Sequence, residues 1–154
     1  MTKLLLSVHV LAAILVVGPI AVAASLFPRY ARQSASGGGG TGDRDAGAAA
    51  LLHRICRGYA VVGVTVPVFG IATGARLGVL TDAWLLVSLV LTALAAAVLV
   101  LAIVPGQRRM LEPAGHEGAR SAAARLSMLT GVFNILWAIV VVLMIVRPGS
   151  TTGA

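Results

Sequence analysis

The residues of this chain best suited to chemistry are its three histidines, because imidazole is a common metal and haem ligand. His9 lies within an apolar run near the start, His53 lies just before a second apolar run, and His116 lies in a polar connection. A bis-histidine haem site needs two rings at the same depth in the bilayer. We expect His9 and His53 near opposite faces of the membrane, so one haem cannot bind both within a single chain.

Methionine is the other candidate ligand type, and Met144 is expected near the depth of His9. One imidazole and one thioether are few donors for a copper site, and methionines in helices mostly fill packing space. The sequence therefore predicts no bound metal, and no haem on the chain alone. It leaves open a haem- or copper-handling protein centred on His9, with Met144 as a weak second ligand. The plainer prediction is that His9 hydrogen-bonds a neighbouring helix.

Asn134 is the second polar side chain expected inside the membrane. On a helix it shares a stripe with Gly131 and other small residues, and Ser88 and Thr92 mark a similar stripe in an earlier run. No acidic residue or lysine lies inside an apolar run, so the usual groups of a proton or ion relay are missing. We expect helix packing at Gly131 and Asn134, with hydrogen bonds between helices.

A glycine stripe marks the second apolar run. Gly63, Pro67, Gly70 and Gly74 fall 4, 3 and 4 residues apart, which places them on one face of a helix. Gly70 and Gly74 form a GxxxG pattern, which lets a neighbouring backbone approach closely. We expect all four to be helix-packing positions, and this helix to be the one around which the others pack.

Pro19 and Pro67 interrupt the first and second apolar runs. Each lacks a backbone N–H and frees the carbonyl four residues earlier, at Leu15 and Gly63. Broken helices line the sites of some transporters, so a small transporter using these two kinked helices is a further hypothesis. Few polar groups lie nearby, which favours simple kinks.

Four charge-free runs must position these residues, at 4–28, 58–75, 83–107 and 126–146. They hold 25, 18, 25 and 21 residues, and a membrane-spanning helix needs roughly 17–25. The chain is 58% hydrophobic and 11% charged, whereas soluble domains are about 45–50% apolar and about 25% charged. We predict an all-α, four-transmembrane-helix bundle in one domain over residues 1–154. Its helices are expected at about 4–27, 55–75, 83–105 and 126–146.

The connections predict two antiparallel hairpins and an orientation. The short segment 76–82 forces its two flanking helices to be antiparallel neighbours. Nine of the twelve Lys and Arg residues lie in the loops 28–57 and 106–125. The positive-inside rule places both loops in the cytoplasm and both termini on the other side. Within the first loop, the Gly- and Ser-rich stretch at about 33–43 predicts a flexible linker.

The first apolar run also has features of a signal peptide, with Lys3 before it and small residues at Ala21-Val22-Ala23. Its apolar segment from Leu4 to Ile20 has 17 residues, which exceeds the roughly 7–15 of the apolar region of a signal peptide. Arg29 and Arg32 follow closely, and basic residues resist export. We therefore expect the run to be retained as a helix.

The two ends of the chain carry a family resemblance. The opening is Lys3-Leu-Leu-Leu-Ser-Val-His9-Val-Leu-Ala-Ala, followed by Val17-Gly18, and the close is Val142-Leu-Met-Ile-Val-Arg147-Pro-Gly149. Both resemble an uncharacterised bacterial family of predicted four-helix integral membrane proteins, itself distantly similar to copper-resistance D-type membrane domains. Those domains show a tryptophan and a Gly pair after the first-helix histidine, where this chain has Val16-Val17-Gly18-Pro19. The resemblance implies a four-helix membrane fold and no established activity.

The expected function is non-enzymatic, because no catalytic constellation is recognisable. We expect an accessory or scaffold subunit of a bacterial inner membrane, in contact with the lipid bilayer and packing against other membrane protein subunits or against itself. A net charge of +7 would suggest a nucleic-acid partner in a soluble protein. Here the basic residues sit at the edges of apolar runs, so topology explains them and no nucleic-acid partner is expected.

Overall fold

Helices make up nearly all of the chain that the structure describes. The computed structural model describes residues 2–37, 40–112 and 118–149. In chain order the elements are α1 (Thr2–Ser36), α2 (Gly40–Val62), α3 (Thr65–Leu77), α4 (Ala83–Ala97), the π-helix η1 (Val98–Ile103), α5 (Val104–Leu111) and α6 (Ala119–Val146).

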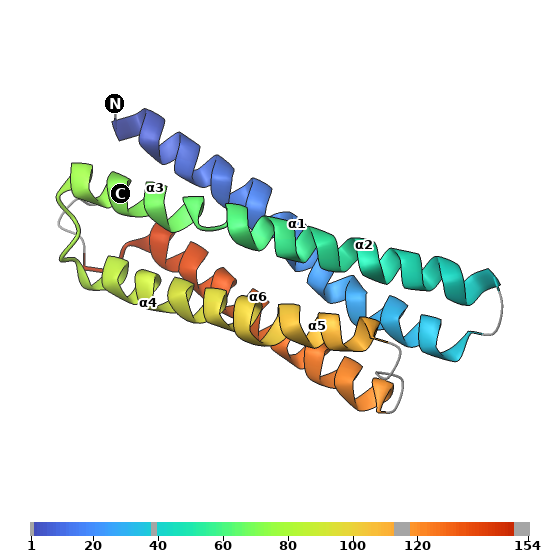
Figure 1. The fold of residues 1–154 in the computed structure, drawn as a ribbon. Coiled ribbons are helices and arrows are strands. Elements are labelled where there is room, and N and C mark those ends of the chain that lie inside the picture. The colour runs from blue at the N-terminus through green and yellow to red at the C-terminus, as the bar shows by residue number, and fades with distance from the viewer. Residues whose placement is uncertain (1, 38–39, 113–117, 150–154) are drawn as a thin grey trace.

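These elements form four long helical segments, because α3 continues α2, and because η1 and α5 continue α4 (Figure 1). Within the described ranges, four segments are long and apolar enough to cross a membrane: Lys3–Ser36, Gly40–Leu77, Ala83–Leu111 and Ala119–Val146. The predicted all-α architecture of four potential spans is confirmed.

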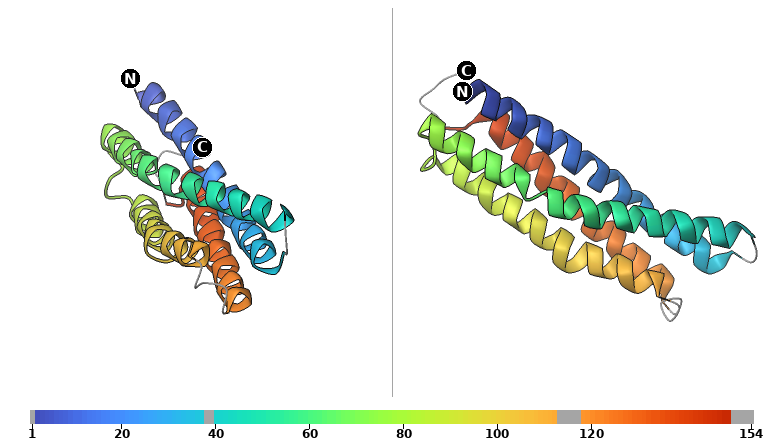
Figure 2. Two further views of the ribbon diagram at one scale, coloured as in Figure 1. Left: turned by 45° about the vertical axis from the view of Figure 1, so that its right-hand side comes forward. Right: turned by 45° about the horizontal axis from the view of Figure 1, so that its top comes forward.

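Successive segments run in opposite directions, so the bundle has two distinct ends (Figure 2). The start of α1, the connection from α3 to α4 and the end of α6 lie together, and we call this the terminal end. The opposite end, where α1 leads to α2 and α5 leads to α6, is called the loop end below. The arginines expected in the cytoplasm belong to the loop end.

The helix around which the others pack is α1, since it contacts α2, α3, α5 and α6. Its inward stripe lies at the centre of the core and comprises Val16, Ile20, Ala23, Ala24 and Phe27. The expectation that the helix over 58–75 fills this role is wrong. The reason is burial: α3 buries only Val66, Thr73 and Gly74 among its residues, whereas α1 offers a buried seam along most of the bundle.

The helices at the loop end continue beyond the charge-free runs. The linker predicted at about 33–43 is wrong in extent, because α1 continues to Ser36 and α2 begins at Gly40, with residues 38–39 outside the described part. Ala31 and Ala49 are buried in a core cluster of this end. Such tertiary packing stabilises a helix in spite of weak local propensity, and the many alanines favour helix in any case.

The first segment passes through two prolines, Pro19 and Pro28, without ending. Pro28 has no N–H to donate, which frees the carbonyl of Ala24. The hydroxyl of Thr130 on α6 donates to this oxygen at 3.4 Å. A side chain from a neighbouring helix thus satisfies a carbonyl that proline leaves unpaired, as membrane helices commonly require.

The second segment is broken at Gly63 and Val64, so the helix predicted over 55–75 is two helices. Pro67 cannot donate to the Gly63 carbonyl, which instead accepts the N–H of Val66 at 3.1 Å. The hydroxyl of Thr65 donates to the carbonyl of Val62 at 2.7 Å. Of the two helices in the transporter hypothesis, only this one is interrupted; the first remains helical through its proline.

The third segment passes through Pro105, where the sequence predicts its end. The N–H of Val104 donates to the carbonyl of Leu99, five residues back, which is the spacing of a π-helix. Since Pro105 has no N–H, the regular α-helical pattern cannot be kept there. The wider turn of η1 absorbs the interruption, and the helix continues as α5 to Leu111.

Candidate functional site

His9 is buried on α1 at the terminal end, with 7% of its surface exposed. Its Nδ1 atom lies 2.9 Å from the backbone carbonyl oxygen of Val66, in the first turn of α3. A carbonyl oxygen only accepts, so Nδ1 carries a proton and donates it. In the neutral ring, Nε2 then has the free lone pair that accepts a hydrogen bond or binds a metal.

Two glycines of α3 make room for side chains of neighbouring elements. A Cβ atom at Gly70 would lie 2.9 Å from Cε1 and 3.3 Å from Nδ1 of His9. A Cβ atom at Gly74 would lie 2.9 Å from Cδ2 of Leu85 and 3.2 Å from Cδ2 of Leu80. The glycines therefore form notches that receive side chains, in place of the close backbone approach expected from the GxxxG pattern.

Gly63 and Pro67, the other members of the predicted glycine stripe, belong to the break between α2 and α3. A Cβ atom at Gly63 would be nearest the carbonyl oxygens of Tyr59 and Ala60, at 3.1 and 3.3 Å. Its contact with α1 would be an ordinary 3.5 Å, to Cγ1 of Val16. The absence of a side chain at Gly63 therefore relieves crowding within its own segment, at the break between α2 and α3, more than it allows α1 to approach.

A cavity of about 680 Å³ opens beside His9 at the terminal end. Side chains from four helices line it, among them His9, Thr73, Trp84, Met144 and Arg147. Among the described residues, every fully buried side-chain nitrogen or oxygen has a hydrogen bond. Nε2 of His9 has no hydrogen bond to a described residue, so this atom is not fully buried and is accessible from the cavity. His9 and Met144, the pair of the copper hypothesis, therefore line the same cavity.

The rim of this terminal cavity is polar and aromatic. The indole N–H of Trp84 donates to a carboxylate oxygen of Asp82 at 3.0 Å. The guanidinium carbon of Arg147 lies 5.6 Å from the centroid of the Trp84 ring, within the range of a cation–π contact. The Nε atom of Arg147 also donates to the Met144 carbonyl at 3.3 Å. Through its contact with Trp84, Arg147 joins the end of α6 to α4.

The chemistry available in the terminal cavity is limited. It offers one imidazole nitrogen and one thioether, while the Thr73 hydroxyl already donates to the Phe69 carbonyl at 2.7 Å. In the part of the chain that the structure describes, no three His, Cys, Asp or Glu side chains come together to hold a metal ion. His116 lies outside the described residues.

Gly131 and Asn134 lie beside the buried face of α6. A Cβ atom at Gly131 would meet nothing within 4 Å, so the tight packing expected there is absent from the described residues. Asn134 is half-buried, and its amide makes no hydrogen bond to any described residue. Ser127 and Ala138, on the same stripe, are exposed. The buried positions of α6 are instead Ala123, Leu126, Thr130, Phe133 and Val140.

Sequence reasoning missed a polar network on the loop-end side of the core. The Nδ1 atom of His53 lies 3.1 Å from Oε1 of Gln107, and Nε2 of Gln107 donates to Sγ of Cys56 at 3.5 Å. Gln107 and Cys56 are both fully buried. His53 is therefore engaged with Gln107, apart from the cavity of His9. The only signal was the place of Gln107 as the last residue of a charge-free run.

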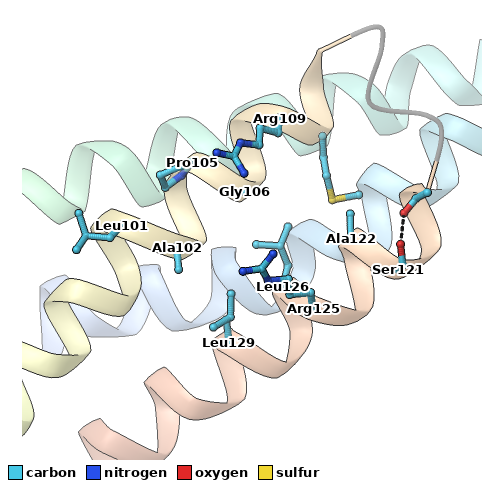
Figure 3. Close-up of a pocket in the computed structure, with 12 residues that line it drawn as sticks. Leu101, Ala102, Pro105, Gly106, Arg109, Ser121, Ala122, Arg125, Leu126 and Leu129 are labelled. Atoms are coloured by element: carbon cyan, nitrogen blue, oxygen red, sulfur yellow. Dashed lines mark hydrogen bonds between the residues drawn. The ribbon is translucent and has the colours of Figure 1, made fainter.

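A groove of about 500 Å³ between α5 and α6 was also missed. Arg109 and Arg125 line its mouth from the two facing helices, and Leu101, Ala102 and Leu129 lie further along it (Figure 3). In the sequence these arginines served only as signals of orientation. Their convergence depends on how α5 packs against α6, which no local pattern reveals.

Comparison with protein-family models, with curated proteins and with solved structures found no match for this chain. The resemblance drawn from the two ends of the sequence therefore identifies no family. What can be said of function rests on the geometry of the chain itself.

Proposed function

We propose that this chain is a non-enzymatic, multi-pass protein of a bacterial inner membrane, and that it serves as an accessory or scaffold subunit. Its four apolar segments support a place in the bilayer, because large apolar side chains are exposed along each of them. Leu4, Ile14, Val61, Leu101 and Ile145 are examples. In this proposal the loop end faces the cytoplasm and the terminal end faces the other side.

The observation that carries the accessory role is the Asn134 amide. It lies near the middle of α6, half-buried and without a hydrogen bond to any described residue. Leaving an amide unpaired in an apolar medium costs roughly 2–7 kcal/mol. A hydrogen bond to a further transmembrane helix removes that cost. Gly131, Ser127 and Ala138 on the same stripe are small, so a second helix can approach closely.

The occupant that fits this stripe is a second copy of the chain. A carboxamide both donates and accepts, so one Asn134 satisfies another. In a two-fold dimer the same surface of each protomer faces its partner, which brings two α6 stripes together. The scaffold is accordingly a homodimer built on α6.

The test is the monomer–dimer equilibrium of purified protein in proteoliposomes, measured by energy transfer between labels at Thr81→Cys in a Cys56→Ser background. We expect dimers, and we expect Asn134→Leu to weaken dimerisation roughly 3- to 30-fold, the equivalent of an interhelical hydrogen bond of about 0.6–2 kcal/mol. Asn134→Gln keeps an amide and should retain part of the association.

Ile135→Leu is the matched control, because Ile135 is exposed on another side of α6 and the exchange nearly conserves volume. The proposal fails if Asn134→Leu and Ile135→Leu dimerise equally well. It also fails if the wild-type protein stays monomeric at every lipid dilution.

Binding of haem or copper in the terminal cavity is a second candidate function, favoured by the accessible Nε2 of His9 and by Met144 in the same lining. Visible absorbance and metal analysis of the purified protein test it. A Soret band or stoichiometric copper that disappears in His9→Ala would support binding. A colourless, copper-free protein that also takes up neither group when they are supplied would remove this candidate.

A further inference from the structure

The groove between α5 and α6 combines a charged mouth with an apolar floor. Arg109 on α5 and Arg125 on α6 lie on facing walls of the mouth (Figure 3). The floor is made by Leu101, Ala102, Leu126 and Leu129. Pro105 and Gly106 of α5 also line the groove. A Cβ atom at Gly106 would lie 2.8 Å from Cδ2 of Leu126, so the missing side chain lets α5 pack closely against α6.

The groove spans the boundary between charged and apolar sequence. Arg109 lies just beyond the charge-free run that ends at Gln107, and Arg125 directly precedes the run that begins at Leu126. Leu101 is eight residues before Arg109, which corresponds to roughly 12 Å along the helix. A molecule in the groove would therefore have one end at the membrane surface and the other roughly 40% of the way into a roughly 30 Å apolar core.

The mouth is electropositive. No carboxylate pairs with Arg109 or Arg125 among the described residues, and the ion pair found there joins Arg108 to Glu112 at 3.7 Å on the exposed surface. Gly118, which also lines the groove, begins α6 with no side-chain cap among the described residues. The N–H groups of a helix start add positive potential beside the arginines.

From these features we propose that the groove binds an anionic phospholipid of the cytoplasmic leaflet. Its phosphate lies between the guanidinium groups of Arg109 and Arg125, and one acyl chain lies along Leu101, Ala102 and Leu129. Arginine suits this role because its planar fork binds phosphate oxygens in pairs. Basic pockets between transmembrane helices are known sites for such headgroups. This site shares no residue with the α6 stripe around Asn134.

The test is native mass spectrometry of delipidated protein titrated with dioleoylphosphatidylglycerol or dioleoylphosphatidylcholine. One arginine near a membrane surface corresponds to roughly a five-fold change in affinity. We expect the glycerol lipid to bind roughly 25-fold more tightly than the choline lipid. Arg109→Gln and Arg125→Gln should each remove about five-fold of that preference, and the double variant should abolish it.

The control pair is Arg54→Gln with Arg57→Gln, since both arginines are exposed on α2 and lie outside the groove. Equal loss in this pair would overturn the proposal, because the effect would then be general surface charge. If the Gln double variant does not fold, Arg109→Lys with Arg125→Lys keeps the charge, and loss of the paired contacts should still weaken binding several-fold.

The lipid and a free anion are distinguished by the apolar floor. Ala102→Phe fills the groove and keeps both arginines, so it should weaken binding of the glycerol lipid. Inorganic phosphate at millimolar concentration should not displace the lipid from the wild type. If Ala102→Phe binds the lipid as the wild type does, or if inorganic phosphate displaces the lipid at millimolar concentration, the lipid assignment is overturned and a phosphate site remains.

Discussion

Among single residues, the fit of His9 against Gly70 is one of the contacts that join α1 to α3. Gly70→Ala would place its Cβ atom 2.9 Å from the imidazole, so the ring must move and its bond to the Val66 carbonyl must lengthen. We expect the variant to lose about 1–3 kcal/mol of stability, as overfilled contacts do, in unfolding experiments in detergent.

Gly47→Ala is the control for this substitution. Gly47 lies on α2 with nothing within 4 Å of its Cβ position, and alanine in an open helical position usually stabilises by roughly 0.5–1 kcal/mol. In a His9→Ala background, Gly70→Ala should become harmless, because the clashing ring is gone. Equal stability of Gly70→Ala and Gly47→Ala would show that the notch is not tight.

The sequence predicted that His9 hydrogen-bonds a neighbouring helix, and its bond to the Val66 carbonyl of α3 confirms this. The acceptor could not be foreseen, because Val66 becomes its neighbour only when α1 crosses α3. Asn134 shows the opposite case. The sequence placed it in the packed interior, yet Thr130 and Phe133 hold the buried face of α6 and turn Asn134 aside.

At the scale of elements, the four apolar runs predicted the number and order of the helical segments. They did not predict where the segments end. A charge-free run measures the part of a helix that lipid would cover, and the helices continue into Ala- and Arg-rich sequence that packs at the loop end, where Ala31 and Ala49 are buried. Prolines were weaker stop signals than expected, because Thr130 and the π-turn before Pro105 compensate for the lost donors.

The break between α2 and α3 is expected to depend on Pro67. Pro67→Ala restores an N–H that can donate to the Gly63 carbonyl, so we expect α2 and α3 to join into one helix. The backbone bonds around the break are long at present, 3.3 Å from Val64 to Val61 and 3.4 Å from Val68 to Val64. Amide hydrogen exchange in this region should slow at least about ten-fold in the variant.

Pro19→Ala serves as the comparison, because α1 is already continuous through Pro19. Exchange near that position should change little. If exchange near residue 64 is equally fast in Pro67→Ala and in the wild type, the break is imposed by the packing of α3 against α1, and proline is not its cause.

At the scale of the whole molecule, the two ends of the bundle differ in chemistry. The loop end carries the clustered arginines and the groove between α5 and α6, whereas the terminal end carries the cavity of His9 with Trp84 and Arg147 at its rim. The sequence predicted this asymmetry as an excess of basic residues in two of the loops. It did not predict the hollows, because each forms between helices that are distant in sequence.

We propose that the chain crosses the membrane four times and that its loop end faces the cytoplasm. Ser36 is the last residue of α1, at the loop end, and Thr81 lies in the connection from α3 to α4, at the terminal end. Both residues are exposed. Single cysteines at these positions, in a Cys56→Ser background, are treated with a membrane-impermeant thiol reagent in intact cells. We expect Thr81→Cys to be labelled, and Ser36→Cys to be labelled only after the cells are opened. Labelling of Ser36→Cys alone would reverse the orientation, and equal labelling of both would contradict the four-span topology.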